Sequence, residues 1–175
     1  DGACRNFLSE WREIVMRDLN HPSIIAWTPL NETSGAVDII EHKRFVRDLY
    51  EMTRQSDPSR PVNDTSGYVH AVTDLYTVHN YQQPDELRKE LAQGPENVWR
   101  NFPDQDAPYE GQPYIIDEMG GIKYGTPSNP ESWGYNSAGS EEEFYHRLSA
   151  EINAILEHGY IKIGRASCRE RVFSS

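Results

Sequence analysis

Helical and strand periods alternate along most of this chain, and that alternation is the strongest restriction on its fold. Apolar residues recur every three or four positions in residues 5–19, 37–56 and 140–158, as on the buried face of an amphipathic helix. Short apolar runs at 23–30 and 113–118 read as buried strands. Strands that alternate with helices pair in parallel. We therefore expect an α/β fold, which an open doubly wound sheet or part of a (β/α)8 barrel would satisfy.

The remaining elements are shorter. We expect strands at 62–64, 74–79 and 160–163, a helix over 84–99 that Gly94-Pro95 interrupts, and a long loop over 119–139. Ser34 is the expected N-cap of the second long helix, and Ser140 with Glu143 forms an expected capping box for the last one. No glycine-rich phosphate loop follows a strand, which disfavours a nucleotide-binding doubly wound sheet.

The composition argues against several classes of partner. A net charge of -11 disfavours nucleic acids and anionic membranes, because both require basic patches. No run of residues approaches the roughly 18 apolar positions of a membrane span. The two cysteines, Cys4 and Cys168, support neither a disulfide framework nor a zinc site. No group of His, Cys or Asp has metal-ligand spacing, so we expect no metal and no cofactor.

Two apolar runs each end in a glutamate, Glu32 after the first and Glu118 after the second. Reactive side chains gather at the carboxyl ends of parallel strands. The interval between residues 32 and 118 equals about three β/α units of roughly 25–35 residues, which would place the two across a barrel mouth. A pair of facing carboxylates is the minimal apparatus for cleaving a glycosidic bond. Asp117 is an alternative to Glu118 as the inward-facing group.

Two segments around these glutamates resemble glycoside hydrolase family 2. Residues 20–27, Asn-His-Pro-Ser-Ile-Ile-Ala-Trp, together with Asn31-Glu32 are similar to the family's acid/base segment, and residues 113–120 are similar to its nucleophile segment. The similarity extends over about residues 5–160. It implies a (β/α)8 TIM barrel in which this chain supplies about strands four to eight with their helices. It also implies Glu32 as acid/base at the end of strand four and Glu118 as nucleophile at the end of strand seven.

The resemblance also implies roles for five other residues. Asn31 would hydrogen-bond the sugar 2-hydroxyl, and His79 and Tyr81 would hold Glu118 and the sugar ring. Trp133 would form the floor of the sugar subsite. Asp64 lies in a segment similar to one of the family's barrel loops, which makes it a further substrate-binding candidate. Four of the five have a structural alternative: His79 and Tyr81 as packed core residues, Trp133 as a plug of the barrel mouth, and Asp64 as a helix cap.

The function implied is a retaining β-glycosidase that hydrolyses terminal β-linked sugars, β-galactosidase-like, by double displacement with two Glu. A carbohydrate is the one partner expected. A family 5-like endoglycanase and a non-catalytic carbohydrate-binding barrel are the alternatives. The sequence assigns neither the sugar, nor the oligomeric state, nor the localisation.

The chain divides into two expected regions. Residues 1–163 are predicted to be the C-terminal part of a glycosidase barrel. Residues 164–175 show no helical or strand period and resemble a translated sequencing adapter, so we expect a non-native or disordered tail there. Because a part barrel leaves open sheet edges and exposes its core, we expect this piece alone to be unstable and inactive.

Overall fold

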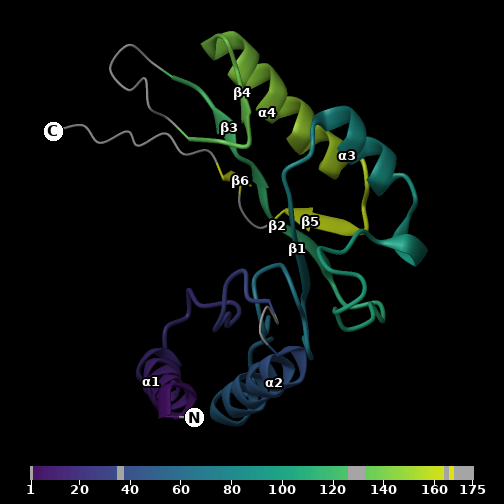
Figure 1. Cartoon of the computed structure of the whole chain (residues 1–175). Coiled ribbons are helices and arrows are strands. Elements are labelled where there is room, and N and C mark those ends of the chain that lie inside the picture. The colour runs from purple at the N-terminus through teal and green to yellow at the C-terminus, as the bar shows by residue number, and fades with distance from the viewer. Residues whose placement is uncertain (1, 35–37, 126–132, 164–165, 168–175) are drawn as a thin grey trace, which may run out of the picture. The chain divides into compact units, whose positions relative to one another are not determined.

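The computed structural model describes residues 2–34, 38–125, 133–163 and 166–167, and it divides into two compact units. Unit 1 comprises Asp1–Val78 and Arg100–Tyr114, and unit 2 comprises His79–Trp99 and Ile115–Ser175 (Figure 1). Within the described ranges, no helix combines the length and the apolar character that crossing a bilayer requires.

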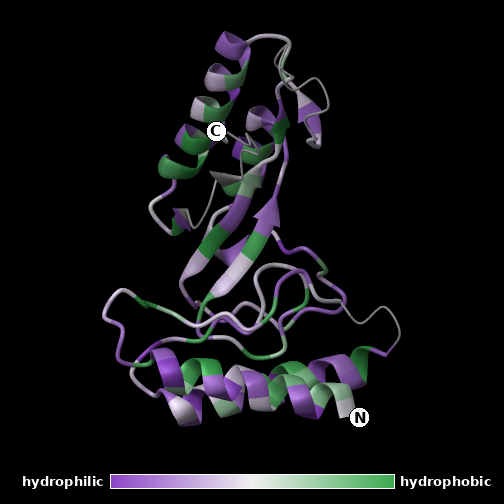
Figure 2. Cartoon of the chain, turned by 90° about the vertical axis from the view of Figure 1, so that its left-hand side faces the viewer, coloured by the Kyte–Doolittle hydropathy of each residue, from purple (hydrophilic) through white to green (hydrophobic). Residues whose placement is uncertain are grey.

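Two amphipathic helices pack against each other in unit 1. Helix α1 spans Gly2–Asp18 and helix α2 spans Ile39–Ser56, so the helices expected over 5–19 and 37–56 are confirmed. Both show hydrophobic and hydrophilic bands along their length in Figure 2, as amphipathic helices do. Their contact includes a hydrogen bond of 2.8 Å from the Trp11 indole to the Thr53 hydroxyl.

The start of α2 differs from the prediction in two respects. Its N-cap is Asp38 rather than Ser34, because the Asp38 carboxylate accepts hydrogen bonds from the backbone N–H groups of Ile40 at 2.8 Å and Glu41 at 3.2 Å. Ile40, which the helical period of residues 37–56 would place on the inner face, is 78% exposed. The buried face is instead carried by Val46, Leu49 and Thr53.

The expected strands at 23–30 and 62–64 are extended segments joined by isolated bridges rather than regular strands. Trp27 pairs with Val62, and Asn31 pairs with Ser66, both in the parallel sense. The Trp27 N–H donates to the Pro61 carbonyl at 3.1 Å. The expected parallel direction is therefore confirmed, whereas the prediction of regular strands over 23–30 and 62–64 is wrong.

The main sheet has strand order β1-β2-β5, with β1 at Tyr76–Asn80, β2 at Tyr114–Gly120 and β5 at Ile161–Ile163. These three confirm the strands expected at 74–79, 113–118 and 160–163. A further two-residue strand, β6 at Ala166–Ser167, pairs with β2 in parallel. It falls inside the segment that we expected to lie outside the fold, so that segment does contribute a short element, and its foreign origin stays a prediction.

Unit 2 also contains four short elements. Helix α3 spans Pro84–Leu91 and a 3-10 turn follows at Pro95–Asn97, so the helix expected over 84–99 divides at Gly94-Pro95. Strands β3 at Ile122–Lys123 and β4 at Asn136–Ser137 pair in parallel within the region expected to be loop.

Helix α4 spans Glu141–Leu156 and packs against α3. Its predicted capping residues are confirmed: the Ser140 hydroxyl accepts from the Glu143 N–H at 3.1 Å, and the Glu143 carboxylate accepts from the Gly139 N–H at 2.7 Å. The buried side of α4 includes Glu151, which is 1% exposed. Among the described residues, neither of its carboxylate oxygens has a hydrogen-bond partner. Burial raises the pKa of Glu151 to about 7, although Arg147 acts in the opposite direction.

This buried carboxyl group predicts that Glu151→Gln stabilises the protein in a pH-dependent way. Between the ordinary pKa near 4.5 and the raised value near 7, the folded state binds more protons than the unfolded state, so stability falls as pH rises through that window. At pH 8 the free energy of unfolding of the variant should exceed that of the parent by about 2–3 kcal/mol, and at pH 4.5 the two values should be similar. Urea unfolding midpoints at the two pH values measure this, with the exposed Glu142→Gln as control. Equal shifts at both pH values would contradict it.

Candidate functional site

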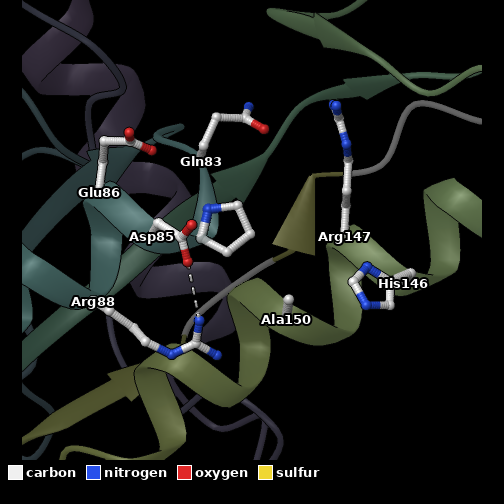
Figure 3. A pocket seen from close by; sticks show the side chains of 8 residues that line it. Gln83, Asp85, Glu86, Arg88, His146, Arg147 and Ala150 are labelled. Atoms are coloured by element: carbon white, nitrogen blue, oxygen red, sulfur yellow. Dashed lines mark ion pairs between the residues drawn. The ribbon is translucent and has the colours of Figure 1, made fainter.

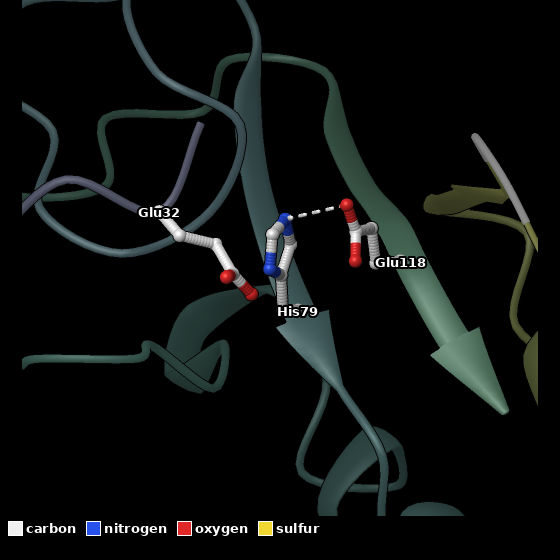
Figure 4. Close-up of side chains that lie close together, drawn as sticks. All are labelled: Glu32, His79 and Glu118. Atoms are coloured by element: carbon white, nitrogen blue, oxygen red, sulfur yellow. Dashed lines mark ion pairs between the residues drawn. The ribbon is translucent and has the colours of Figure 1, made fainter. Parts of the chain in front are cut away.

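Glu118 lies near the end of β2, where two side chains approach it: His79 of β1, and Tyr81, which directly follows β1. The Tyr81 hydroxyl donates a hydrogen bond to Glu118 Oε2. His79 and Glu118 point toward each other, with 3.8 Å between His79 Nε2 and Glu118 Oε1 (Figure 4). The same His79 nitrogen lies 3.5 Å from Asp117 Oδ1. His79 is 1% exposed and Glu118 is 21% exposed, so a buried imidazole supports a carboxylate that solvent can reach.

A row of aromatic rings continues from Tyr81. Its ring centroid lies 4.2 Å from that of Tyr135, and the Tyr135 centroid lies 4.8 Å from that of Trp133. Trp133 is 57% exposed. Aromatic faces of this kind bind apolar C–H surfaces. The structure therefore brings His79, Tyr81 and Glu118 together within unit 2, with Trp133 joined to them through Tyr135, a residue that we did not single out.

Glycine at position 121 permits this aromatic row. Gly121 has φ of +62°, and a Cβ there would lie 2.6 Å from Tyr135 Cδ2 and 3.3 Å from Tyr81 Cδ1. The Gly121 carbonyl accepts a hydrogen bond of 2.8 Å from the Tyr135 N–H. A larger residue would have to displace both rings, so the turn after β2 and the aromatic row depend on each other.

In unit 1, Glu32 occupies an unusual backbone conformation. Its φ is +53°, in the left-handed region that non-glycine residues rarely adopt. Its N–H donates to the Ser66 carbonyl at 3.0 Å, and the Ser66 N–H donates to the Leu30 carbonyl at 2.8 Å. Neighbouring Asn31 is exposed. Such conformations cost about 1–3 kcal/mol and concentrate at functional sites. The strained turn therefore supports Glu32 as a functional residue.

Asp64 differs from its predicted role. It is fully buried, and its carboxylate contacts His70 Nδ1 at 2.6 Å. It also accepts hydrogen bonds from the backbone N–H groups of Thr65 at 2.9 Å, Ala71 at 2.7 Å and Val72 at 3.0 Å. Because these four internal contacts occupy a fully buried carboxylate, Asp64 does not present it to a sugar in this structure, contrary to what we had expected. The group instead holds the loop from residue 64 to residue 72.

His70 continues this buried network, which the sequence did not reveal. Its Nε2 lies 2.7 Å from the Thr77 carbonyl, and the backbone N–H of His70 donates to the Asp106 carboxylate at 2.7 Å. Burial alone would lower the pKa of His70, but the hydrogen bond and charge of Asp64 outweigh burial, so the pKa is raised. Asp106 also accepts from the Tyr76 hydroxyl at 2.8 Å, and burial raises the pKa of Asp106. Both ring nitrogens of His70 thus lie beside acceptors, Nδ1 at the Asp64 carboxylate and Nε2 at the Thr77 carbonyl.

A pocket between α3 and α4 in unit 2 contains none of the predicted residues. Its volume is about 290 Å³. Its lining is charged and polar, with Arg88 and Asp85 paired at 3.7 Å (Figure 3). The other lining residues are Gln83, Pro84, Glu86, His146, Arg147 and Ala150. Its lining includes no Phe, Tyr or Trp face for a sugar ring, so the candidate site is the end of β2 rather than this pocket.

Comparison with known proteins identifies the family. Residues 3–147 match the model described as "Glycosyl hydrolases family 2, TIM barrel domain". The chain belongs to this family. The expected α/β TIM barrel class is thereby confirmed, while the assignment of particular barrel strands to this chain stays a prediction.

Curated relatives carry two activity names. The chain is 30% identical over 107 residues to a beta-galactosidase of Photobacterium profundum, covering 58% of the chain and 9% of that protein. It is 30% identical over 113 residues to a beta-glucuronidase of Canis lupus familiaris, covering 57% of the chain and 17% of that protein. The chain thus covers less than a fifth of either relative.

Solved structures show the same fold. A Bacteroides uniformis beta-glucuronidase superposes with a TM-score of 0.67 at 17% identity, over 95% of this chain and 21% of the other. A beta-D-glucuronidase for Dictyoglomus thermophilum superposes with a TM-score of 0.65 at 20% identity, over 91% of this chain and 28% of the other.

The buried pair of Asp64 and His70 predicts a local, pH-dependent loss of stability in His70→Gln. Because the pKa of His70 is raised, its stabilisation is complete below the unfolded pKa of about 6.5 and is lost as pH rises through the folded value. Removing one partner of a buried pair costs about 3–5 kcal/mol. Hydrogen exchange of the Ala71 and Val72 amides in His70→Gln should therefore be much faster than in the parent at pH 6. At pH 9 the difference from the parent should be smaller. The exposed His21→Gln is the control, and unchanged exchange at pH 6 would contradict the assignment.

Proposed function

We propose that this chain contributes both catalytic carboxylates to a retaining β-glycosidase. The observation that carries the proposal is the setting of Glu118, a part-exposed carboxylate at the end of a parallel strand, bound by Tyr81 and backed by buried His79. Membership of glycosyl hydrolase family 2 supports it. The left-handed backbone at Glu32 supports the second carboxylate.

In the first step, the Glu118 carboxylate attacks the anomeric carbon. A bond forms between a Glu118 oxygen and that carbon, while the bond from the carbon to the leaving oxygen breaks. Protonated Glu32 gives its proton to the leaving oxygen, which departs as an alcohol. The Tyr81 hydroxyl bound to Glu118 Oε2 orients the carboxylate, so that Oε1 is the attacking atom.

In the second step, water releases the sugar. Glu32, now a carboxylate, removes a proton from the water as its oxygen bonds to the anomeric carbon, and the ester bond to Glu118 breaks. Two inversions retain the β configuration. The mechanism requires the two carboxyl groups to lie about 5–5.5 Å apart when they act on one sugar. Asn31 would bind the 2-hydroxyl, and Trp133 would stack on the sugar ring.

We infer a neutral β-galactoside as the preferred sugar class. Beta-galactosidase and beta-glucuronidase are both names of relatives. A glucuronide carries a carboxylate, which a cationic side chain would bind best. The side chains identified around Glu118 are Tyr81, His79 and Asp117, and none of these three carries a permanent positive charge. Parallel assays with p-nitrophenyl β-galactoside and β-glucuronide separate the two classes, and preferential turnover of the glucuronide would reverse the inference.

The nucleophile assignment predicts that Glu118→Ala abolishes turnover. In the full-length protein, hydrolysis of aryl β-glycosides should fall by at least about 10³-fold, because no covalent intermediate can form. Exposed Glu110→Ala is the control and should retain activity. Azide added to Glu118→Ala should yield the α-glycosyl azide by a single inversion. Turnover equal to that of the control would refute the assignment.

The acid/base assignment predicts that the effect of Glu32→Ala depends on the leaving group. Glycosylation should slow by about 10²–10⁴-fold for a poor alkyl leaving group. For 2,4-dinitrophenolate, which needs no proton, glycosylation should change little. Pre-steady-state rates with the two substrates measure this, and azide should accelerate release as the β-glycosyl azide. A uniform loss with both substrates would show that Glu32 is not the acid.

A further inference from the structure

Helix α3 is tied to the residues that flank Tyr81 by one carboxylate, that of Glu90. Glu90 Oε2 accepts a hydrogen bond of 3.0 Å from the Asn80 side-chain amide, and Oε1 accepts one of 2.7 Å from the Gln82 side-chain amide. The Asn80 oxygen accepts a further bond of 3.0 Å from the Gln82 N–H. The segment from Asn80 to Gln82 is therefore closed by three bonds, and two of them end on Glu90.

Helix α3, which carries Glu90, is itself held in place by packing and by a hydrogen bond. Leu87 and Leu91, on the same helix as Glu90, are 1% and 2% exposed. The Tyr160 hydroxyl donates to the Leu91 carbonyl at 2.7 Å. A carboxylate on a packed helix has little freedom, and bonds from neutral amides to a charged acceptor are stronger than bonds between neutral groups.

We propose that Glu90 is a positioning residue for the glycosidase reaction, which it serves by fixing Tyr81 on Glu118. The inference rests on the proposed function only in naming the reaction that benefits. The bonds of Glu90 hold Asn80 and Gln82, the residues on either side of Tyr81, and so set the path of the backbone between them. Tyr81 in turn donates to Glu118. Glu90 touches neither the nucleophile nor the sugar in this chain of contacts.

Loss of this anchor would free the segment from Asn80 to Gln82. A misplacement of about 1 Å at a catalytic contact can cost about 100-fold in rate. The Tyr81 contact orients the nucleophile for attack and is not a sugar-binding contact in this proposal. The effect should therefore fall on kcat, with KM nearly unchanged.

The test compares three variants of the full-length protein. Glu90→Leu, which removes both acceptors, should lower kcat for an aryl β-galactoside about 10–100-fold and change KM less than about 3-fold. Glu90→Gln should recover most of the loss, because its amide accepts from Asn80 and donates to a rotated Gln82 amide. Glu86→Leu, on the exposed part of the same helix, should match the parent.

A double-variant cycle decides whether the effect passes through Tyr81. In a Tyr81→Phe background, Glu90→Leu should cost less than about 3-fold, because the contact that it supports is already absent. Independent, additive losses would overturn the proposal, as would a Glu90→Leu enzyme equal to Glu86→Leu. If Glu90→Leu fails to fold by circular dichroism, Gln82→Met removes one anchoring bond without altering α3, and it should give an intermediate loss of kcat.

A readout without turnover separates this inference from the proposed function. With 3-fluorotyrosine at position 81, the fluorine resonance should shift or broaden in Glu90→Leu and return toward that of the parent in Glu90→Gln. A parent protein without glycosidase activity would refute the proposed function, while the resonances would still decide whether Glu90 orders Tyr81. An unchanged resonance in Glu90→Leu would refute the positioning role.

Discussion

The end of β1 is the constraint on which the candidate chemistry depends. Successive side chains of an extended strand point to opposite sides. His79 and Tyr81 accordingly face the carboxyl groups of β2, whereas Asn80 between them faces Glu90 of α3. One extended segment thus supplies two contacts to the nucleophile candidate and one contact to the scaffold. A shift of one residue in the path of this segment would exchange the two sets, so its bonds to α3 matter as much as its contacts with Glu118.

Unit 1 meets a different demand, which is to stabilise a strained turn. The left-handed conformation at Glu32 costs about 1–3 kcal/mol, so neighbouring structure has to compensate for it. Ser66 bridges the strained segment, and the loop that follows Ser66 is held by the buried carboxylate of Asp64 and its contact with His70. The carboxylate that we expected at the sugar therefore serves the backbone on which Glu32 depends.

Periodic features of the sequence predicted the long elements well. Helices α1, α2 and α4 and strands β1 and β2 lie within a few residues of their predicted bounds, because amphipathic repeats and caps are local signals. Strands β3 and β4 are two residues each, too short to show a period. Asp38 displaced Ser34 as a cap because it lies directly before the first turn. The residues beside Glu118 were predicted from a family resemblance, whereas Glu90 contacts them from an ordinary helical position that carries no sequence signal.

The chain is rich in acidic residues, and residue type alone does not separate their roles. Asp64 is buried and saturated by donors, Glu90 is shared between two amides, and Glu151 is buried without a hydrogen-bond partner among the described residues. Glu118 differs from all three, since it combines partial exposure with a hydroxyl donor and a nearby imidazole. A nucleophile has to be charged, oriented and reachable at once. A carboxylate whose oxygens are all bound by internal donors cannot reach a sugar, and a buried carboxylate without a hydrogen-bond partner is disfavoured in its charged form. Glu118 is therefore the one of these four carboxylates whose contacts suit attack on a sugar.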